Sequence, residues 1–131
     1  MRETGKASGK GNLHGELAPC KSHDVLQRLG EKWTYLTITM LSRAEGDWVR
    51  ASDIKTNIRG ISQRMLTVTL RNLERDGMVL RQVHAEVPPR VEYALTPLAL
   101  SMLPTLAGLT GWIDAHWENI ERARAAYDLK R

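Results

Sequence analysis

The sequence predicts a mainly α-helical fold with a small β-hairpin, an α+β class. Apolar residues recur at helical spacing along most of the chain, whereas two β-prone segments, 78–85 and 90–95, are separated only by "EVPP". Prolines at that point donate no ladder hydrogen bonds, so they belong at the tip between two strands. With 131 residues, 42% apolar and 26% charged, the chain has the size and composition of one globular domain.

Two helices and a short strand are expected first. One helix starts at Ser22 and stops at Gly30, and a second covers about 32–43. A turn at 44–47 separates the second helix from one short strand within 48–51. The residues of the second helix that lie near helical spacing, and that should form its buried face, are Trp33, Leu36, Met40 and Leu41.

Two further helices follow, separated by a glycine. The third helix is expected to have its N-cap at Ser52 or Asp53, and Gly60 supplies the break after it. Ser62 is a good N-cap for the fourth helix, which covers 62–75. The apolar residues at i, i+4 and i+7, predicted to anchor this helix, are Leu66, Leu70 and Leu73.

The last helix is predicted to begin at Thr96–Pro97 and to run to about Tyr127, with Pro104 kinking or dividing it. It carries a narrow apolar stripe that suits a seam with the same helix of a second copy. The alternative is a helix packed on its own domain. The residues assigned to a dimer interface, two of them from the first helix, are Val25, Leu26, Leu106, Leu109, Trp112, Ile113, Trp117 and Ile120.

The order of these elements is that of a winged helix-turn-helix. Two short helices joined by a glycine-containing turn, 53–75, form the helix-turn-helix, and the hairpin directly after them, 78–95, forms the wing. We expect dimerisation through the N- and C-terminal helices. The expected domain organisation is a flexible, basic, Gly-rich arm at 1–18, the winged domain at 19–112, and a continuous dimerisation helix and tail at 104–131.

The helix-turn-helix and wing carry the positive charge of the chain. Residues 55–90 contain seven Lys or Arg and three Asp or Glu, a balance of +4 that equals the formal net charge of the whole chain. The major groove of B-DNA accepts an α-helix, so we expect double-stranded DNA as the partner. The expected base-edge contacts are Gln63, Arg64, Thr67 and Arg71; the expected phosphate contacts are Arg59, Ser62, Arg75, Arg81 and, from the wing, Arg90. A winged-helix module that docks an acidic protein partner without reading DNA is the alternative.

Other function classes are disfavoured. One cysteine allows no internal disulfide and no cysteine-rich zinc site, and the four histidines are scattered. We find no paired catalytic carboxylates, no Ser-His-Asp order and no Gly-rich phosphate loop after a strand. The sequence therefore predicts no enzyme, no metal and no cofactor. Without an apolar run of signal-peptide or membrane-spanning length, it also predicts a cytoplasmic protein with no membrane span.

Four separated segments, in order, point to a family. They are "LGEKWTYLTITML" (29–41), "GISQRMLTVTLRNLERDGMVLR" (60–81), "EVPPRVEYALTPL" (86–98) and "LPTLAGLTGW" (103–112). Together they resemble the HxlR-type winged-helix transcription regulators of bacteria, over roughly 19–112. The resemblance implies a homodimer on a pseudo-palindromic operator, at the nucleoid when bound, with the recognition helix at 62–75 and the wing tip at 86–90.

The resemblance also implies a sensing role for Cys20, which stands twelve residues before Lys32, where members of this family commonly carry a cysteine. Some members sense electrophiles, quinones or oxidants through that residue. Lys21 beside Cys20 favours a reactive thiolate, whereas the alternative is a buried thiol packed at the dimer interface. Whether the protein represses or activates, and whether its effector is an oxidant, an electrophile or another small molecule, stays open.

Overall fold

The computed structural model describes residues 15, 17 and 20–130. The chain divides into two units, Met1–Glu31 and Lys32–Arg131. In the first unit, α1 (Lys21–Leu29) begins after Cys20 as N-cap and ends at Gly30, so the predicted first helix is confirmed. No residue of α1 is buried. The arm predicted at 1–18 lies, apart from residues 15 and 17, outside the described residues.

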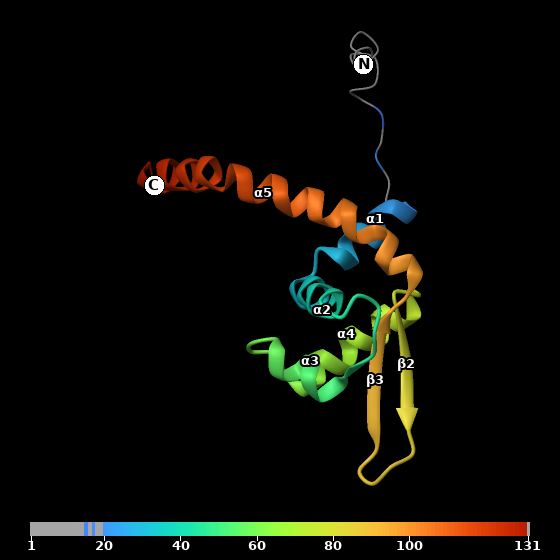
Figure 1. The fold of residues 1–131 in the computed structure, drawn as a ribbon. Coiled ribbons are helices and arrows are strands. Elements are labelled where there is room, and N and C mark those ends of the chain that lie inside the picture. The colour runs from blue at the N-terminus through green and yellow to red at the C-terminus, as the bar shows by residue number, and fades with distance from the viewer. Residues whose placement is uncertain (1–14, 16, 18–19, 131) are drawn as a thin grey trace. The chain divides into compact units, whose positions relative to one another are not determined.

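The second unit is a helical core with a three-stranded antiparallel sheet (Figure 1). Strand order in the sheet is β1-β3-β2, so the short strand predicted near residue 49 is added to the edge of the predicted hairpin. The predicted winged helix-turn-helix is therefore confirmed. Its elements are α2 (Lys32–Ser42), β1 (Val49–Arg50), α3 (Ala51–Asn57), α4 (Gln63–Arg75), β2 (Val79–His84), β3 (Arg90–Leu95) and α5 (Pro97–Leu129).

The core fixes α4 against the rest of the unit. α4 packs against α2 and β2, and its predicted leucine anchors are buried to 2% exposure or less. Burying one such side chain stabilises the fold by about 1.5–3 kcal/mol. The other buried apolar side chains come from all the neighbouring elements: Ile38, Leu41, Ile54, Ile58, Ile61, Val79, Ala94, Leu95 and Ala99.

The hairpin has a regular register. β2 pairs with β3 from Val79 opposite Leu95 to His84 opposite Arg90, and β1 pairs with β3 through Arg50 opposite Glu92. Residues 85–89 form the tip and include both prolines, as predicted. Thr96 caps α5 by accepting a hydrogen bond from the Ala99 backbone N–H, at 3.2 Å, which confirms the predicted helix start. The wing therefore leads directly into the last helix.

The predicted buried face of α2 was wrong. Only Leu41 of that set is buried, whereas the other three are half-buried. The buried face consists of Thr34, Thr37, Ile38 and Leu41. α2 packs against α3, α4 and β3 at once, so apolar residues occur around the helix and their spacing does not single out one face. Threonine at the contacts allows close approach of the neighbouring elements.

Two other local predictions also differ from the structure. α3 begins at Ala51 with Arg50 as N-cap and no side-chain cap, because the helix starts directly where β1 ends. Ser52 and Asp53 consequently lie inside its first turn. α5 is one continuous helix, so of the two outcomes predicted for Pro104, a kink or a division, the division is wrong. Proline removes one backbone hydrogen bond from the helix there, and the Pro104 residue is exposed.

Among the described residues, α5 has the length and composition of a membrane span, with a mean hydropathy of 1.2 in its most apolar window. This is weak support for a span. The helix starts inside the domain core, where Ala99 is fully buried, and it carries charged residues from Asp114 onward.

Candidate nucleic-acid interface

α4 is capped and anchored so that one side of it stays free. The Ser62 hydroxyl accepts a hydrogen bond from the Met65 backbone N–H at 3.0 Å, as expected of an N-cap. The buried residues of α4 lie on one face of the helix. Gly60 adopts a φ of +86° in the turn before α4, a conformation that favours glycine. The sequence thus sets both the start and the orientation of the helix.

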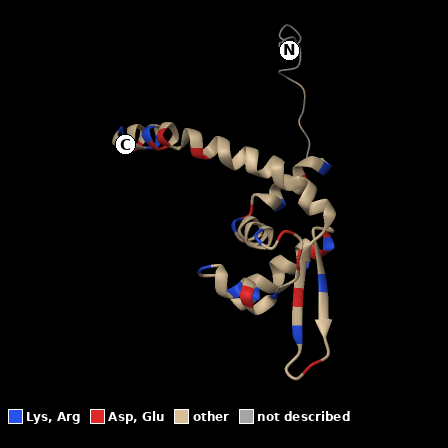
Figure 2. Ribbon diagram, viewed as in Figure 1, with Lys and Arg blue, Asp and Glu red and all other residues tan. Residues whose placement is uncertain are grey.

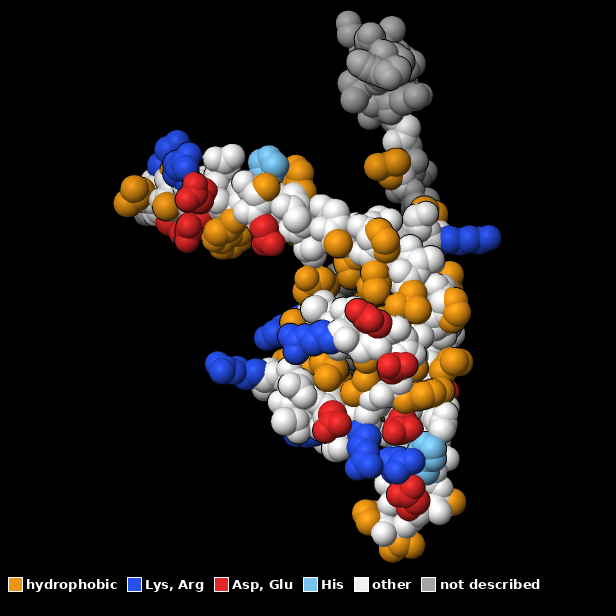
Figure 3. Space-filling view, viewed as in Figure 1, with side chains coloured by type: hydrophobic (Ala, Val, Ile, Leu, Met, Phe, Trp, Pro, Cys, Tyr) orange, Lys and Arg blue, Asp and Glu red, His pale blue; other side chains and the backbone are white. Residues whose placement is uncertain are grey.

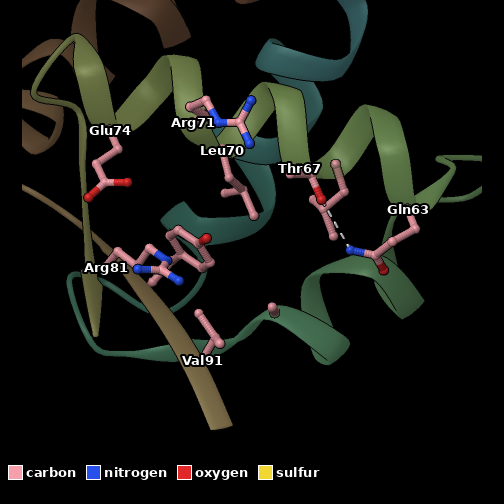
Figure 4. A pocket seen from close by; sticks show the side chains of 10 residues that line it. Gln63, Thr67, Leu70, Arg71, Glu74, Arg81 and Val91 are labelled. Atoms are coloured by element: carbon pink, nitrogen blue, oxygen red, sulfur yellow. Dashed lines mark hydrogen bonds between the residues drawn. The ribbon is translucent and has the colours of Figure 1, made fainter. Parts of the chain in front are cut away.

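All four residues predicted to contact base edges are exposed: Gln63, Arg64, Thr67 and Arg71. At about 100° per residue, Arg64 and Arg71 project away from the leucine face, whereas Gln63 and Thr67 lie toward the wing. The Gln63 amide Nε2 donates to the Thr67 hydroxyl at 3.3 Å, so these two side chains hold each other in place (Figure 4). The amide oxygen of Gln63 remains available as an acceptor.

A hollow of about 430 Å³ lies between α4 and the sheet. In Figure 4, Gln63, Thr67, Arg71 and Glu74 of α4 line one side, and Arg81 of β2 and Val91 of β3 lie across from them. Tyr93 of β3 also lines the hollow. Two guanidiniums on opposite walls make this a suitable place for a phosphate group, although the Glu74 carboxylate shares the hollow.

Three of the arginines predicted to contact phosphates also lie at the surface. Arg59 in the α3–α4 turn, Arg75 in the last turn of α4 and Arg81 on β2 are exposed. Figure 2 shows acidic residues interleaved with basic ones on the wing strands, and Figure 3 shows a cluster of both signs beside a histidine toward the tip of the wing. Positive charge is therefore least compensated around α4 and more balanced on the wing.

The wing arginine is paired with acids, a feature that sequence reasoning missed. Arg90 Nη1 lies 3.0 Å from Glu86 Oε2, and Arg90 Nε lies 3.5 Å from Glu92 Oε2. The other oxygen of Glu92, Oε1, is 2.8 Å from His84 Nε2, which in turn is 2.9 Å from Gln82 Nε2. The signal was present in the strand, because Arg90 and Glu92 are two residues apart and share a face of the sheet.

The residues assigned to the dimer interface are largely uncovered in the single chain. Leu109, Trp112, Ile113 and Trp117 of α5 are 39–56% exposed, and Leu106 and Ile120 are half-buried. Along the exposed helix, the Trp112 and His116 rings stack at 4.5 Å, and Arg124 lies 5.3 Å from the centre of the Trp117 ring. In the first unit, Val25 and Leu26 are 48% and 64% exposed. A large apolar surface therefore remains on both helices.

The sensing candidate is at the start of α1. Cys20 is exposed, and it is the N-cap residue of that helix.

Within the described part of the chain, no three His, Cys, Asp or Glu side chains form a group that could hold a metal ion.

Comparison with known families identifies the fold group. The model of the HxlR-like helix-turn-helix family matches residues 28–121. This chain belongs to the HxlR-like helix-turn-helix family. The match spans α2 to most of α5 and so includes the helix-turn-helix, the wing and the predicted dimer stripe of α5.

Named relatives within this family are transcriptional regulators. An uncharacterised HTH-type transcriptional regulator of Methanothermobacter thermautotrophicus is 41% identical over 103 residues, 76% of each chain. The uncharacterised HTH-type transcriptional regulator YtfH of Escherichia coli is 36% identical over 115 residues, 88% of this chain and 87% of its own.

Solved structures agree. The putative transcriptional regulator YtfH of Salmonella typhimurium superposes with a TM-score of 0.70 at 33% identity, covering 81% of this chain and 92% of its own. The reduced form of the redox regulator HypR superposes with a TM-score of 0.66 at 32% identity, covering 79% and 99%. Transcription regulation by a helix-turn-helix protein, the main function predicted from the sequence, is confirmed at this level, whereas a protein-interaction module without DNA readout gains no support.

Proposed function

We propose that this HxlR-like protein is a dimeric, sequence-specific DNA-binding regulator that acts by binding, not catalysis, in the bacterial cytoplasm. One observation carries the proposal most directly. The polar, arginine-bearing face of α4 is exposed along its length, while the leucines on its other side are buried in the core. A helix held in this way can enter a major groove without any rearrangement of the chain.

In the proposed complex, α4 reads bases and the residues around it fix its position. Arg64 and Arg71 suit guanine O6 and N7, Gln63 suits adenine, and the Thr67 methyl suits a thymine methyl. Arg59, Arg75 and Arg81 surround α4 and are placed to meet phosphates, which position the protein without specifying sequence. The Ser62 hydroxyl accepts a bond from Met65, but its own hydrogen remains free to donate to a phosphate.

The proposed role of Arg90 is conditional. In the proposed complex it exchanges its contact with Glu86 for one with a phosphate. That exchange makes the wing contribute less to affinity than an unpaired arginine would, and it makes the contribution sensitive to Glu86.

The proposed dimer uses the exposed stripes of α5 and α1. A two-fold dimer would place two copies of α4 about 34 Å apart, one turn of B-DNA, which requires a pseudo-palindromic operator. The exposed apolar side chains of α1 and α5 support this dimer interface, because a single chain would leave them in water.

Selection of bound sequences from a random DNA pool tests the function. The expected result is an enriched inverted repeat whose half-sites are separated by about one helical turn. Binding of that repeat should weaken steeply between 50 and 200 mM salt, by roughly 10³-fold or more if several phosphates are contacted. Absence of enrichment, together with salt-independent binding, would favour the alternative module that docks an acidic protein.

The proposed signal is a thiol-reactive compound acting at Cys20. The exposure of Cys20 and the structural similarity to the redox regulator HypR support this proposal. Modification of a thiol at the N-cap of α1 would alter a helix assigned to the dimer interface, and would thereby change the spacing of the two recognition helices.

A further inference from the structure

A second hollow lies beside the tip of the wing. It measures about 410 Å³ and is bounded on one side by Arg50, Ala51 and Ser52, where β1 passes into α3. Residues 86–91 of the wing tip and β3 bound the other side. Ala51 and Val91 line both this hollow and the one beside α4, so the two hollows adjoin.

Two arginines line this second hollow, and their charges are not equally available. Arg90 is held by Glu86 and by Glu92. Glu92 Oε1 is 2.8 Å from His84 Nε2 and Glu92 Oε2 is 3.5 Å from Arg90 Nε, a contact without a hydrogen bond, whereas the cross-strand neighbour Arg50 forms no ion pair with Glu92. Within the described residues, Arg50 is exposed and forms no ion pair.

Arg50 is also rigidly placed relative to the recognition helix. Its backbone is paired with Glu92 in the sheet and serves as the N-cap of α3, the first helix of the helix-turn-helix. α3 is anchored by the fully buried Ile54 and leads through the turn at 58–62 into α4. The position of the Arg50 backbone is therefore determined by the same elements that determine the position of α4.

We propose that Arg50 is a further phosphate-contacting residue. It contacts the DNA backbone at the place between the wing and the helix-turn-helix, a role that charge counting assigns to Arg90. The proposal rests on the proposed DNA-binding function. A DNA strand that passes the hollow beside α4 continues into the adjoining one, where Arg50 presents an unpaired guanidinium. The charges of Arg50, Arg90, Glu86 and Glu92 sum to zero, so the contact is a short-range hydrogen bond and not a long-range attraction.

The test measures binding of a random-sequence duplex by fluorescence anisotropy across a series of salt concentrations, because a phosphate contact needs no operator. Arg50→Gln should lower affinity roughly tenfold and decrease the slope of log K on log salt by about 1 for each protomer bound. Arg50→Lys should keep the slope but bind more weakly than wild type, because an ammonium cannot form the bidentate contact. Arg43→Gln removes the same charge from an exposed site after α2 and serves as the control.

The outcomes separate the two proposals. An unchanged slope for Arg50→Gln, in a wild-type protein that binds DNA with the expected salt dependence, overturns the role of Arg50 alone. A slope that falls equally for Arg43→Gln also overturns it, since the effect would then report net charge. Wild-type binding without salt dependence overturns the DNA-binding function and the role of Arg50 with it. Substitution at Arg50 should not impair folding, because the side chain is exposed and makes no capping hydrogen bond.

Discussion

Removing an acid from the wing should strengthen DNA binding. Glu86 Oε2 lies 3.0 Å from Arg90 Nη1, and the two side chains are 50% and 28% exposed. A pair this accessible to solvent is worth only about 0.2–1 kcal/mol. In the proposed complex Arg90 leaves Glu86 to contact a phosphate, so that energy is subtracted from binding in the wild-type protein. Glu86→Gln should therefore raise affinity by about 1.4-fold to 5-fold.

The measurement is anisotropy of a labelled duplex at one fixed salt concentration. Glu45→Gln is a matched control, since it adds the same unit of charge at an exposed turn after α2. Glu92 remains near Arg90 Nε in the variant, so Arg90 keeps a partner in the free protein. Affinity no higher than that of Glu45→Gln would show that Arg90 does not meet a phosphate and that the ion pair serves to hold the tip.

Three further predictions concern the readout, the dimer and the signal. Arg64→Ala should cost about 1–3 kcal/mol on the selected operator and much less on random duplex; an equal loss on both would make Arg64 a phosphate contact. Trp117→Glu should shift the protein from dimer to monomer in sedimentation velocity. Ala115→Glu, at an exposed site on α5 away from the apolar stripe, should leave the dimer intact. If the dimer persists in Trp117→Glu, α5 is not part of the interface. Electrophile treatment should weaken operator binding by wild type but not by Cys20→Ser, and an equal loss in both would place the signal elsewhere.

Local, periodic features of this fold could be read from the sequence. The Ser62 cap, the three leucines of α4 and the Thr96 cap each depend on residues within one or two helical turns. The buried face of α2 could not be read in that way, because α2 contacts three other elements and is apolar on more than one side. Periodicity identifies a buried face only where another face is polar.

The candidate site could also be read from the sequence only in part. Exposure of Gln63, Arg64 and Arg71 follows from the phase of the leucines along one helix. The pairing of Arg90 was missed because charges were counted and not paired: Glu86 was counted without being matched to Arg90, and Glu92, two residues along the same strand, lies beyond the segment used to count charge. Counting charges along the sequence thus overestimated the positive charge that the wing offers to DNA. The count also left out Arg50, which precedes the counted segment.

In the proposed dimer, the gain from α5 alone can be compared with the gain when α1 also contributes. Leu109, Trp112, Ile113 and Trp117 are 39–56% exposed, so each has about half of its burial still to gain. At about 1.5–3 kcal/mol for full burial, these side chains from two copies would contribute about 6–12 kcal/mol, against an association cost of about 4–15 kcal/mol. A seam of α5 alone is therefore near balance. If α1 also joins the proposed interface, Val25 and Leu26 from both copies add about 3–6 kcal/mol on the same basis, which raises the total gain to about 9–18 kcal/mol and shifts the balance toward association.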